Sequence, residues 1–320
     1  MAINVQIATP ITLFQYAQGL PQTSMARIFV ENMVAESDVM RTIPFLPAQN
    51  GKRAFLDIAD LPAVGFRGIN EAGNESTGHY NLREEDTFFI DEYVKYDRAL
   101  VDRLGPGGEE KQVRLKSISL SQMFTQKLVK GDTTSNPREP TGLQARCTVP
   151  GINLFHNSTA SGGAALSLGN LDALYWSVNK PTHWIVPRGL MPFFDIAARS
   201  NSLTNQTLSF DTDDFGRRIT KYKGLPILFG YEPDDSPDML PFTEVASGGG
   251  GAVTSSIYLA SFRDGGLYAI EQTPLAIEDE GRIVGQPFFS THIKWDWGFA
   301  REHPRSVARL DSITAASLVA

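Results

Sequence analysis

Cysteine is almost missing from this chain of 320 residues, in which Cys147 is the single example. One thiol cannot form an intrachain disulfide, so the sequence excludes the disulfide-stapled scaffolds of small secreted proteins. It also excludes a zinc site built from several thiolates. A nucleophilic role for Cys147 would require a histidine close in space, such as His156, and a buried inert thiol is the expected alternative.

A basic excess and long apolar runs are absent too. Asp and Glu together number 36 against 29 Lys and Arg, which gives a net charge of −7. Proteins that wrap nucleic acid by neutralising its phosphates carry the opposite balance. No stretch approaches the roughly 18–20 consecutive apolar residues of a membrane-spanning helix. We therefore expect a protein that is made in a bacterial cytoplasm, does not bind nucleic acid tightly and does not span a membrane.

The start of the chain lacks charge, since Arg27 is the first charged residue. The apolar residues before it are scattered among Asn, Gln and Thr, whereas a signal peptide has a basic start and one apolar run of about 7–15 residues. Two interpretations remain open. The segment is either a terminal element packed on its own domain or an arm that lies on a neighbouring subunit.

Catalytic and metal-binding motifs are missing as well. The five histidines stand in no H-E-x-x-H context, and His183 and His292 are interpreted as ordinary strand residues. Residues 105–111 lack the spacing of a phosphate loop and are explained by a turn that enters a helix. Residues 211–216 match the start of a calcium loop, but Phe215 and Tyr222 occupy two of its ligand positions. We expect no catalytic residue, no metal site, no cofactor and no enzymatic activity.

What the sequence does contain begins with two strands. Apolar residues alternate with period two over 52–58 and again over 87–96, which predicts a strand in each segment. The connection from about Asp60 to Asp86 is polar, contains glycine and is too long for a tight turn. We predict a projecting two-stranded ribbon, which must rest on another surface because an isolated hairpin is barely stable in water.

The strongest helical pattern lies between Glu109 and Lys130. Val113, Leu120, Phe124 and Leu128 form one apolar stripe. Acidic residues at the start and basic residues at the end complement the helix dipole, and the glycine at position 131 ends the helix. At 1.5 Å per residue the helix is about 33 Å long, long enough to span a whole domain.

The remaining segments predict an α/β region followed by a looser one. Their patterns favour short helices over 11–18 and 24–35, helices over 168–178 and 190–199, strands over 183–186, 256–261 and 267–270, and a hairpin over 217–229 around Lys223-Gly224. A clear alternation returns near the end, where Ile293, Trp295 and Trp297 are separated by Lys294 and Asp296.

This order of segments resembles that of the major capsid proteins of tailed bacteriophages, whose fold is shared by herpesvirus capsids and encapsulins. The local resemblances are Lys116–Phe124 with Lys130-Gly131-Asp132 and Pro140–Leu143 for the spine helix and its exit loop, His183–Pro187 and Gly224–Ile227 for two strands, and Ile293–Ala300 for the closing strands. Each is weak alone, and their order over nearly the whole chain carries the resemblance.

The resemblance implies an α+β fold with a defined set of regions. These are residues 1–50 as the N-terminal arm, 51–100 as the extended β-ribbon loop, 101–143 as the spine helix and exit loop, 144–229 as the peripheral α/β domain, 230–284 as the axial domain, and 285–320 as the return to the peripheral domain. The expected core residues are Leu120, Phe124, Leu128, Trp184, Trp295 and Trp297, and the expected intersubunit contacts are Phe14, Tyr16, Phe66, Arg67 and Arg83.

It further implies a structural function. The chain would assemble with itself as pentamers and hexamers into an icosahedral shell around double-stranded DNA, contacted without specificity. The implied partners are a separate scaffolding protein, a portal and, where present, a decoration protein, with no membrane; the implied location is the virion, after assembly in the host cytoplasm. Three alternatives stay open: an encapsulin-like compartment marked by copurifying cargo, a trimeric decoration or tail protein marked by rings or fibres, and a hydrolase with a dispersed site.

Some members of the family join subunits by an isopeptide bond between a lysine on the extended loop and an asparagine of a neighbour. That reaction needs an amine, because arginine is permanently protonated and a poor nucleophile. Lys52 and Lys95 flank the expected ribbon, and no lysine lies between them. We therefore expect a shell held together without covalent links.

Overall fold

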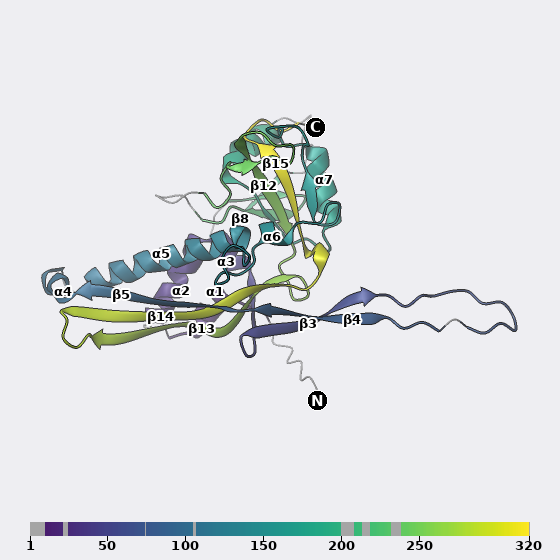
Figure 1. Cartoon of the computed structure of the whole chain (residues 1–320). Coiled ribbons are helices and arrows are strands. Elements are labelled where there is room, and N and C mark those ends of the chain that lie inside the picture. The colour runs from purple at the N-terminus through teal and green to yellow at the C-terminus, as the bar shows by residue number, and fades with distance from the viewer. Residues whose placement is uncertain are drawn as a thin grey trace.

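The computed structural model describes residues 10–21, 25–73, 75–104, 107–199, 208–212, 218–231 and 238–319. The fold is α+β, with a long layer, a compact upper unit above it and a ribbon that projects from one end (Figure 1). No helix in these ranges is long and apolar enough to cross a membrane. The calcium-loop pattern is only partly described, because its residues 213–217 lie outside these ranges.

The long layer is a five-stranded sheet covered by one long helix. Its strand order is β1 (Ile11–Thr12), β2 (Pro44–Pro47), β13 (Leu267–Arg282), β14 (Phe288–Arg301) and β5 (Phe88–Asp97). Helix α5 (Gly107–Lys130) runs beside β5 and β14 (Figure 1) and matches the predicted spine helix. The short helix α4 (Arg98–Leu104) precedes it. Strands β13 and β14 are long because they form one antiparallel hairpin that spans the layer.

The N-terminal helices pack on the body of their own subunit. They are α1 (Leu13–Gly19), α2 (Met25–Glu36) and α3 (Asp38–Thr42). Thr12 and Gln15 form a capping box that starts α1. Phe29, Val30 and Met33 of α2 are fully buried in the same core as the spine helix. The predicted arm over residues 1–50 stays a prediction. Within it, apolar side chains between residues 29 and 46 complete this core, and residues 1–9 and 22–24 lie outside the described ranges.

The ribbon consists of β3 (Lys52–Asp60) and β4 (His79–Asp86), paired antiparallel. Its existence matches the prediction, but its return strand is β4 and not the 87–96 segment. That segment is β5, which leaves the ribbon at Thr87 and pairs with β14 over ten residues. The sequence pattern did not reveal β4 because nearly all of this strand is exposed and polar. Residues 61–73 and 75–78 connect the two strands without regular structure.

The upper unit is built on a sheet of eight strands. Its path runs β6-β15-β12-β7-β10-β9-β8, with β11 beside β12. The strands are β6 (Leu154–His156), β7 (His183–Ile185), β8 (Leu208–Thr212), β9 (Arg218–Tyr222), β10 (Leu225–Leu228), β11 (Glu244–Val245), β12 (Ala252–Ala260) and β15 (Val307–Thr314). The helices around it are α6 (Leu143–Arg146), α7 (Leu168–Ser177) and α8 (Met191–Arg199), with short 3-10 turns at Arg188–Leu190 and Pro304–Ser306.

This topology joins segments that lie on both sides of the division predicted after the spine helix. Strand β12 pairs with β7 and β15, so the segment around 252–260, predicted as axial, shares one sheet with strands of the segment 144–229, predicted as peripheral. Residues 267–301 lie in the long layer instead. Strand pairing between distant segments defines these two units, and the predicted division of the chain at 229 and 284 stays a prediction.

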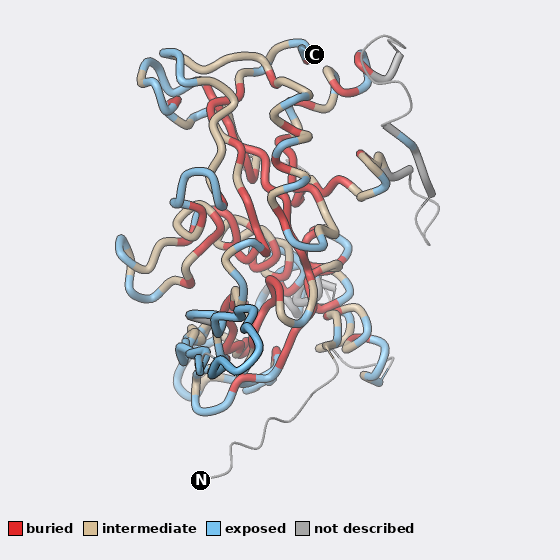
Figure 2. Tube along the Cα trace, turned by 90° about the vertical axis from the view of Figure 1, so that its right-hand side faces the viewer, coloured by how far each residue is buried: buried red, intermediate tan, exposed pale blue. Residues whose placement is uncertain are grey.

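Burial follows the two units. One apolar cluster joins the spine helix, the N-terminal helices and β14 with the nearer face of the upper sheet. A second cluster fills the space between the other face and helices α7 and α8. Figure 2 looks along the ribbon and shows the buried residues concentrated in these parts. Residues 60–73 and 75–84 of the ribbon are, by contrast, all exposed.

Candidate subunit interface

One face of the ribbon carries apolar side chains that the described part of the subunit leaves mostly exposed. Leu56 on β3 lies directly opposite Leu82 on β4, and Tyr80 follows on the same face. These three side chains are 60–67% exposed. Directly opposite apolar pairs contribute only about 0.2–1 kcal/mol each, and two strands without a further packing surface are marginally stable in water. This apolar face is therefore the candidate contact surface of the subunit.

The tip of the ribbon extends the apolar surface. Leu61, Val64, Phe66 and Ile69 are all exposed, and Phe66 is completely so. The backbone around them is organised by polar contacts: Arg67 Nη1 donates to the Glu71 carbonyl at 2.9 Å, and the Gly68 N–H donates to Glu71 Oε2 at 2.7 Å. The tip thus presents large apolar side chains on a loop held by its own hydrogen bonds.

The structure separates the five predicted contact residues. Phe66 and Arg67 lie together at the tip. Arg83 belongs to the strand face opposite Leu82 and pairs with Asp57, with 3.1 Å between Nε and Oδ2. Phe14 and Tyr16 are half-buried on α1 against their own subunit, where burial, followed by the charge of Glu271, raises the pKa of Tyr16. Part of the surface of Phe14 and Tyr16 is therefore covered by their own subunit.

Sequence reasoning missed Leu56, Tyr80 and Leu82 as a contact surface. The available signal was that Tyr80 and Leu82 stand two residues apart, as Leu56 and Ile58 do. It also missed Trp176 on α7, which is 80% exposed. The helical period carried this signal, because Leu171, Leu174 and Val178 form the buried stripe and Trp176 lies outside it.

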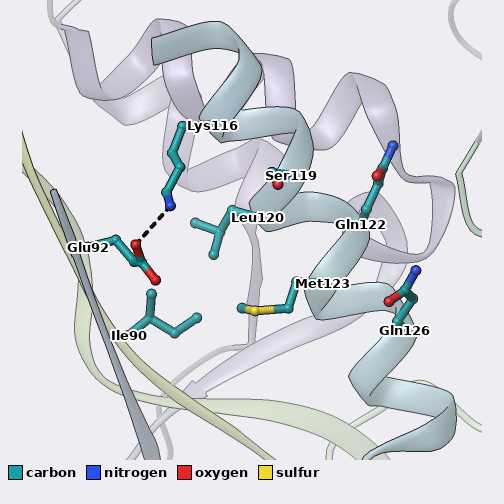
Figure 3. Close-up of a pocket in the computed structure, with 8 residues that line it drawn as sticks. All are labelled: Ile90, Glu92, Lys116, Ser119, Leu120, Gln122, Met123 and Gln126. Carbon is teal, nitrogen blue, oxygen red and sulfur yellow. Dashed lines mark hydrogen bonds and ion pairs between the residues drawn. The ribbon is translucent and has the colours of Figure 1, made fainter. Parts of the chain in front are cut away.

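A groove runs between the spine helix and strand β5 (Figure 3). It has a volume of about 410 Å³, and Ile90, Leu120 and Met123 supply its apolar side chains. The ion pair between Lys116 Nζ and Glu92 Oε2, 2.8 Å long, bridges the helix and the strand. The other lining residues are Ser119, Gln122 and Gln126. A second hollow of about 360 Å³ continues it along β5 and shares Lys116 and Ser119. This arrangement offers a shaped surface but no nucleophile with a base beside it.

The cysteine and histidine side chains that could take part in a reaction are buried or paired with other groups. Burial raises the pKa of the Cys147 thiol to about 12, so it is protonated at neutral pH. Its suggested partner His156 binds Asp311 instead, with 2.8 Å between Nδ1 and Oδ1. Burial lowers the pKa of His183 to about 4. His292 stacks on Tyr93 with ring centroids 4.2 Å apart. No group of three metal-binding side chains occurs within the described ranges.

The six predicted core residues all lie inside the molecule. Their exposure is 5% for Leu120, 0% for Phe124 and Leu128, 1% for Trp184 and Trp295, and 2% for Trp297. Phe124 is surrounded by the rings of Phe45, Trp295, Trp297 and Phe299 at centroid distances of 4.6–5.9 Å. This aromatic cluster fixes the spine helix on the sheet, so the ribbon projects from a rigid base.

Comparisons with known proteins support the same architecture. No protein-family model and no curated protein matches the chain. Solved structures match it over most of its length. The holo-SrpI encapsulin complex of Synechococcus elongatus PCC 7942 has a TM-score of 0.64 and 16% identity, covering 95% of this chain and 96% of that one.

Two phage-type structures agree. A protein of Mycobacterium phage Bobi has a TM-score of 0.59 and 12% identity, covering 86% of this chain and 90% of that chain. The capsid of an empty GTA particle has a TM-score of 0.57 and 12% identity, covering 86% and 89%. The chain therefore has the shell-protein fold that phage capsids and encapsulins share, which is the fold predicted from the sequence.

Proposed function

We propose that the chain is the major capsid protein of a tailed bacteriophage. It assembles with copies of itself, as pentamers and hexamers, into an icosahedral shell that encloses the phage genome. One observation carries the proposal: on a capsid fold, the ribbon exposes the apolar side chains of Leu56, Tyr80, Leu82 and Phe66 far from the subunit's own core. In a shell, every ribbon can bind an adjacent copy of the chain.

The symmetry of a shell agrees with this surface. The ribbon projects from one end of an elongated subunit. In the proposed shell it lies on the body of the next copy, so the contact is heterologous, between different surfaces of two copies. Heterologous contacts close into rings when the rotation between copies allows it, and rings of five and six build a closed shell. The net charge of −7 favours DNA that is packed densely without adhering to the wall.

Further partners belong to the same proposal. A separate scaffolding protein, a portal and, where present, a decoration protein complete the particle, and the DNA is contacted without specificity. The protein functions structurally and not as an enzyme. It is located in the virion after assembly in the cytoplasm of the bacterial host.

Sedimentation velocity of the purified chain tests the proposal. The parent chain is expected to form rings or shells at high concentration. The variant Leu56→Lys/Leu82→Lys should remain a 35 kDa monomer with the parent's melting temperature, because charged side chains oppose burial of the ribbon face. Asn81→Lys adds a charge on the opposite strand face, at an exposed residue; it is the matched control and should assemble. A parent that stays monomeric at high concentration, or a double variant that assembles normally, would contradict the proposal.

A second function has a specific observation in its favour. The encapsulin structure matches at a TM-score of 0.64 and over 95% of this chain, so a cellular compartment with enclosed cargo is the alternative. The contents of particles purified from the natural source distinguish the two. A phage capsid contains double-stranded DNA protected from nuclease, whereas an encapsulin-like shell contains a cargo protein.

A further inference from the structure

The ribbon joins the body through a narrow base at Gly51 and Thr87. Asn50 and Gly51 both have positive φ, at 54° and 72°, and the Thr87 N–H donates to the Gly51 carbonyl at 2.9 Å. Because both strands of the ribbon connect to the body at this one place, the ribbon can rotate about it as a pivot. The direction of the ribbon therefore depends on which side chains beyond the pivot hold it to the body.

Glu85 makes the first of these contacts, from strand β4. Both of its carboxylate oxygens pair with the Arg146 guanidinium at the end of α6, through Nη1 to Oε1 and through Nη2 to Oε2, the latter at 2.9 Å. The same guanidinium donates to the Phe299 carbonyl at 2.9 Å and to the Thr141 carbonyl at 2.8 Å. Because the Arg146 side chain is only 8% exposed, this bidentate pair is well shielded from water and geometrically specific.

Arg53 makes the second contact, from strand β3. Its Nε donates to the Tyr268 hydroxyl at 2.9 Å, and its Nη1 donates to the Pro47 carbonyl at 3.1 Å. The guanidinium carbon also lies 5.3 Å from the centre of the Tyr268 ring, a cation–π distance. Tyr268 in turn donates to Glu302 at 2.6 Å. A fully buried tyrosine of β13 is thus the anchor for this strand.

The two contacts come from one cross-strand pair. Arg53 and Glu85 lie directly opposite each other in the ribbon, and opposite charges in such positions ordinarily attract each other across the strands. Here both reach the body instead, at two separate points. Gly298 of β14 adds a close approach, since a side chain at that position would collide with the Asp86 carbonyl. The ribbon base is therefore held on both strands and against the sheet.

We propose that Arg53 and Glu85 form a two-point clamp that fixes the direction of the ribbon before subunits associate. They are positioning residues, and their role in assembly rests on the proposed function, in which the ribbon binds a second copy. A ribbon that already points in its bound direction loses less conformational freedom when it binds, so association is more favourable. The clamp itself belongs to the single subunit, and it can be tested without any shell.

Pulsed electron paramagnetic resonance on the unassembled chain tests the clamp. Spin labels are placed at His79→Cys, at the far end of β4, and at Trp176→Cys, on exposed α7, in a Cys147→Ala background. The concentration is kept low enough that sedimentation shows monomers. The clamped chain should give a single narrow distance distribution. Arg53→Ala/Glu85→Ala should widen it at least twofold, and Glu85→Gln should give an intermediate width.

The matched control is Glu84→Ala, which removes the neighbouring carboxylate. Glu84 pairs with Lys52 within the ribbon, with 3.1 Å between Oε2 and Nζ, and does not reach the body through this contact. This variant should keep the narrow distribution. Loss of the Glu85 partner of the buried Arg146 can lower the melting temperature, so a near-ultraviolet circular dichroism spectrum equal to the parent's at the temperature of sample preparation excludes partial unfolding as the cause of widening. A double variant with the same width as the clamped chain overturns the clamp, whether or not the protein assembles. A widened distribution together with normal shells would leave the clamp standing but remove its role in assembly.

Discussion

The indole of Trp295 on β14 stacks on the ring of Phe124 in the spine helix, with ring centroids 5.5 Å apart and ring planes 17° apart. The sequence pattern around each residue predicts only that it faces a core. Their contact shows that the two strongest local patterns in the chain, a helix of 24 residues and a strand of 14, bury their apolar faces on each other. This junction is the rigid part of the subunit.

Trp295→Ala should reduce the free energy of unfolding of the unassembled subunit by roughly 3–5 kcal/mol, the usual range for deletion of a buried aromatic side chain. The loss arises because the cavity would lie between Phe45, Phe124 and Trp297, which cannot all close on it. Denaturant melting measures the change. Trp176→Ala removes an 80% exposed indole and should change stability by less than about 0.5 kcal/mol. A loss below about 1 kcal/mol for Trp295→Ala would contradict the packing.

Phe66→Ala/Arg67→Ala should impair assembly and leave the melting temperature unchanged. Both side chains lie at the exposed tip, so the subunit loses no core contact, whereas aromatic residues and arginine dominate the energy of protein interfaces. Light scattering during assembly provides the measurement. Thr77→Ala, in the same exposed loop, is the control. Normal assembly of the double variant would show that the tip makes no important contact.

Asp38 should make the subunit less stable as the pH rises from 4 to 7. Burial raises the pKa of this carboxyl to about 6 from 3.8, although the backbone N–H groups of Phe229 and Gly230 donate to it and Arg41 lies nearby. The folded state therefore binds the proton more tightly than the unfolded state. Its contribution to stability is complete below about pH 4 and disappears as the pH passes 6, a change of roughly 3 kcal/mol.

Urea unfolding at pH 4, 5, 6 and 7 measures this dependence in the parent chain and in Asp38→Asn. The difference in unfolding free energy, parent minus variant, should fall with rising pH. Asp132→Asn is the control, because hydrogen bonds from Ser135 and Thr134 lower the pKa of Asp132 below its ordinary value of 3.8. Its contribution is lost only at pH values below that, so its parent-minus-variant difference should stay nearly flat between about pH 5 and 7. A parent-minus-variant difference for Asp38 that is flat or rises with pH would contradict the prediction.

Purified particles boiled in SDS under reducing conditions should give one band near 35 kDa. The ribbon has no lysine between Lys52 and Lys95, and Lys52 lies at its base, paired with Glu84 and Asp86. The projecting part of the ribbon therefore presents no amine that can attack an amide on a neighbouring subunit. A ladder of subunit multiples on the gel would refute this prediction.

The sequence predicts the elements whose patterns are local. The stripe of Val113, Leu120, Phe124 and Leu128 repeats at the helical period, and the turn at Lys223-Gly224, with φ of 50° and 76°, has residues suited to a tight hairpin. These elements occur as predicted. Strand β13 is longer than predicted. Its distal half, which includes the exposed Glu278 and Asp279, is interrupted by bulges, so the apolar–polar alternation that would have predicted it is lost.

What the sequence could not reveal depends on pairing between distant segments. The partnership of β12 with β7 and β15 decides that the upper unit is one sheet. Likewise, Glu85 looks like an ordinary solvated acid beside Glu84. Only the fold brings Arg146, 61 residues away, to its carboxylate. Contacts between two charged residues so far apart leave no trace in composition or periodicity.

Electron cryomicroscopy of the particles that the purified chain forms tests the central proposal most directly. The account predicts closed shells of uniform diameter, built of pentamers and hexamers, with each ribbon lying on the adjacent copy and Leu56, Leu82 and Phe66 buried at that contact. Trimers, fibres or isolated subunits at high concentration, or shells whose ribbons extend into solvent without touching a neighbour, would contradict it.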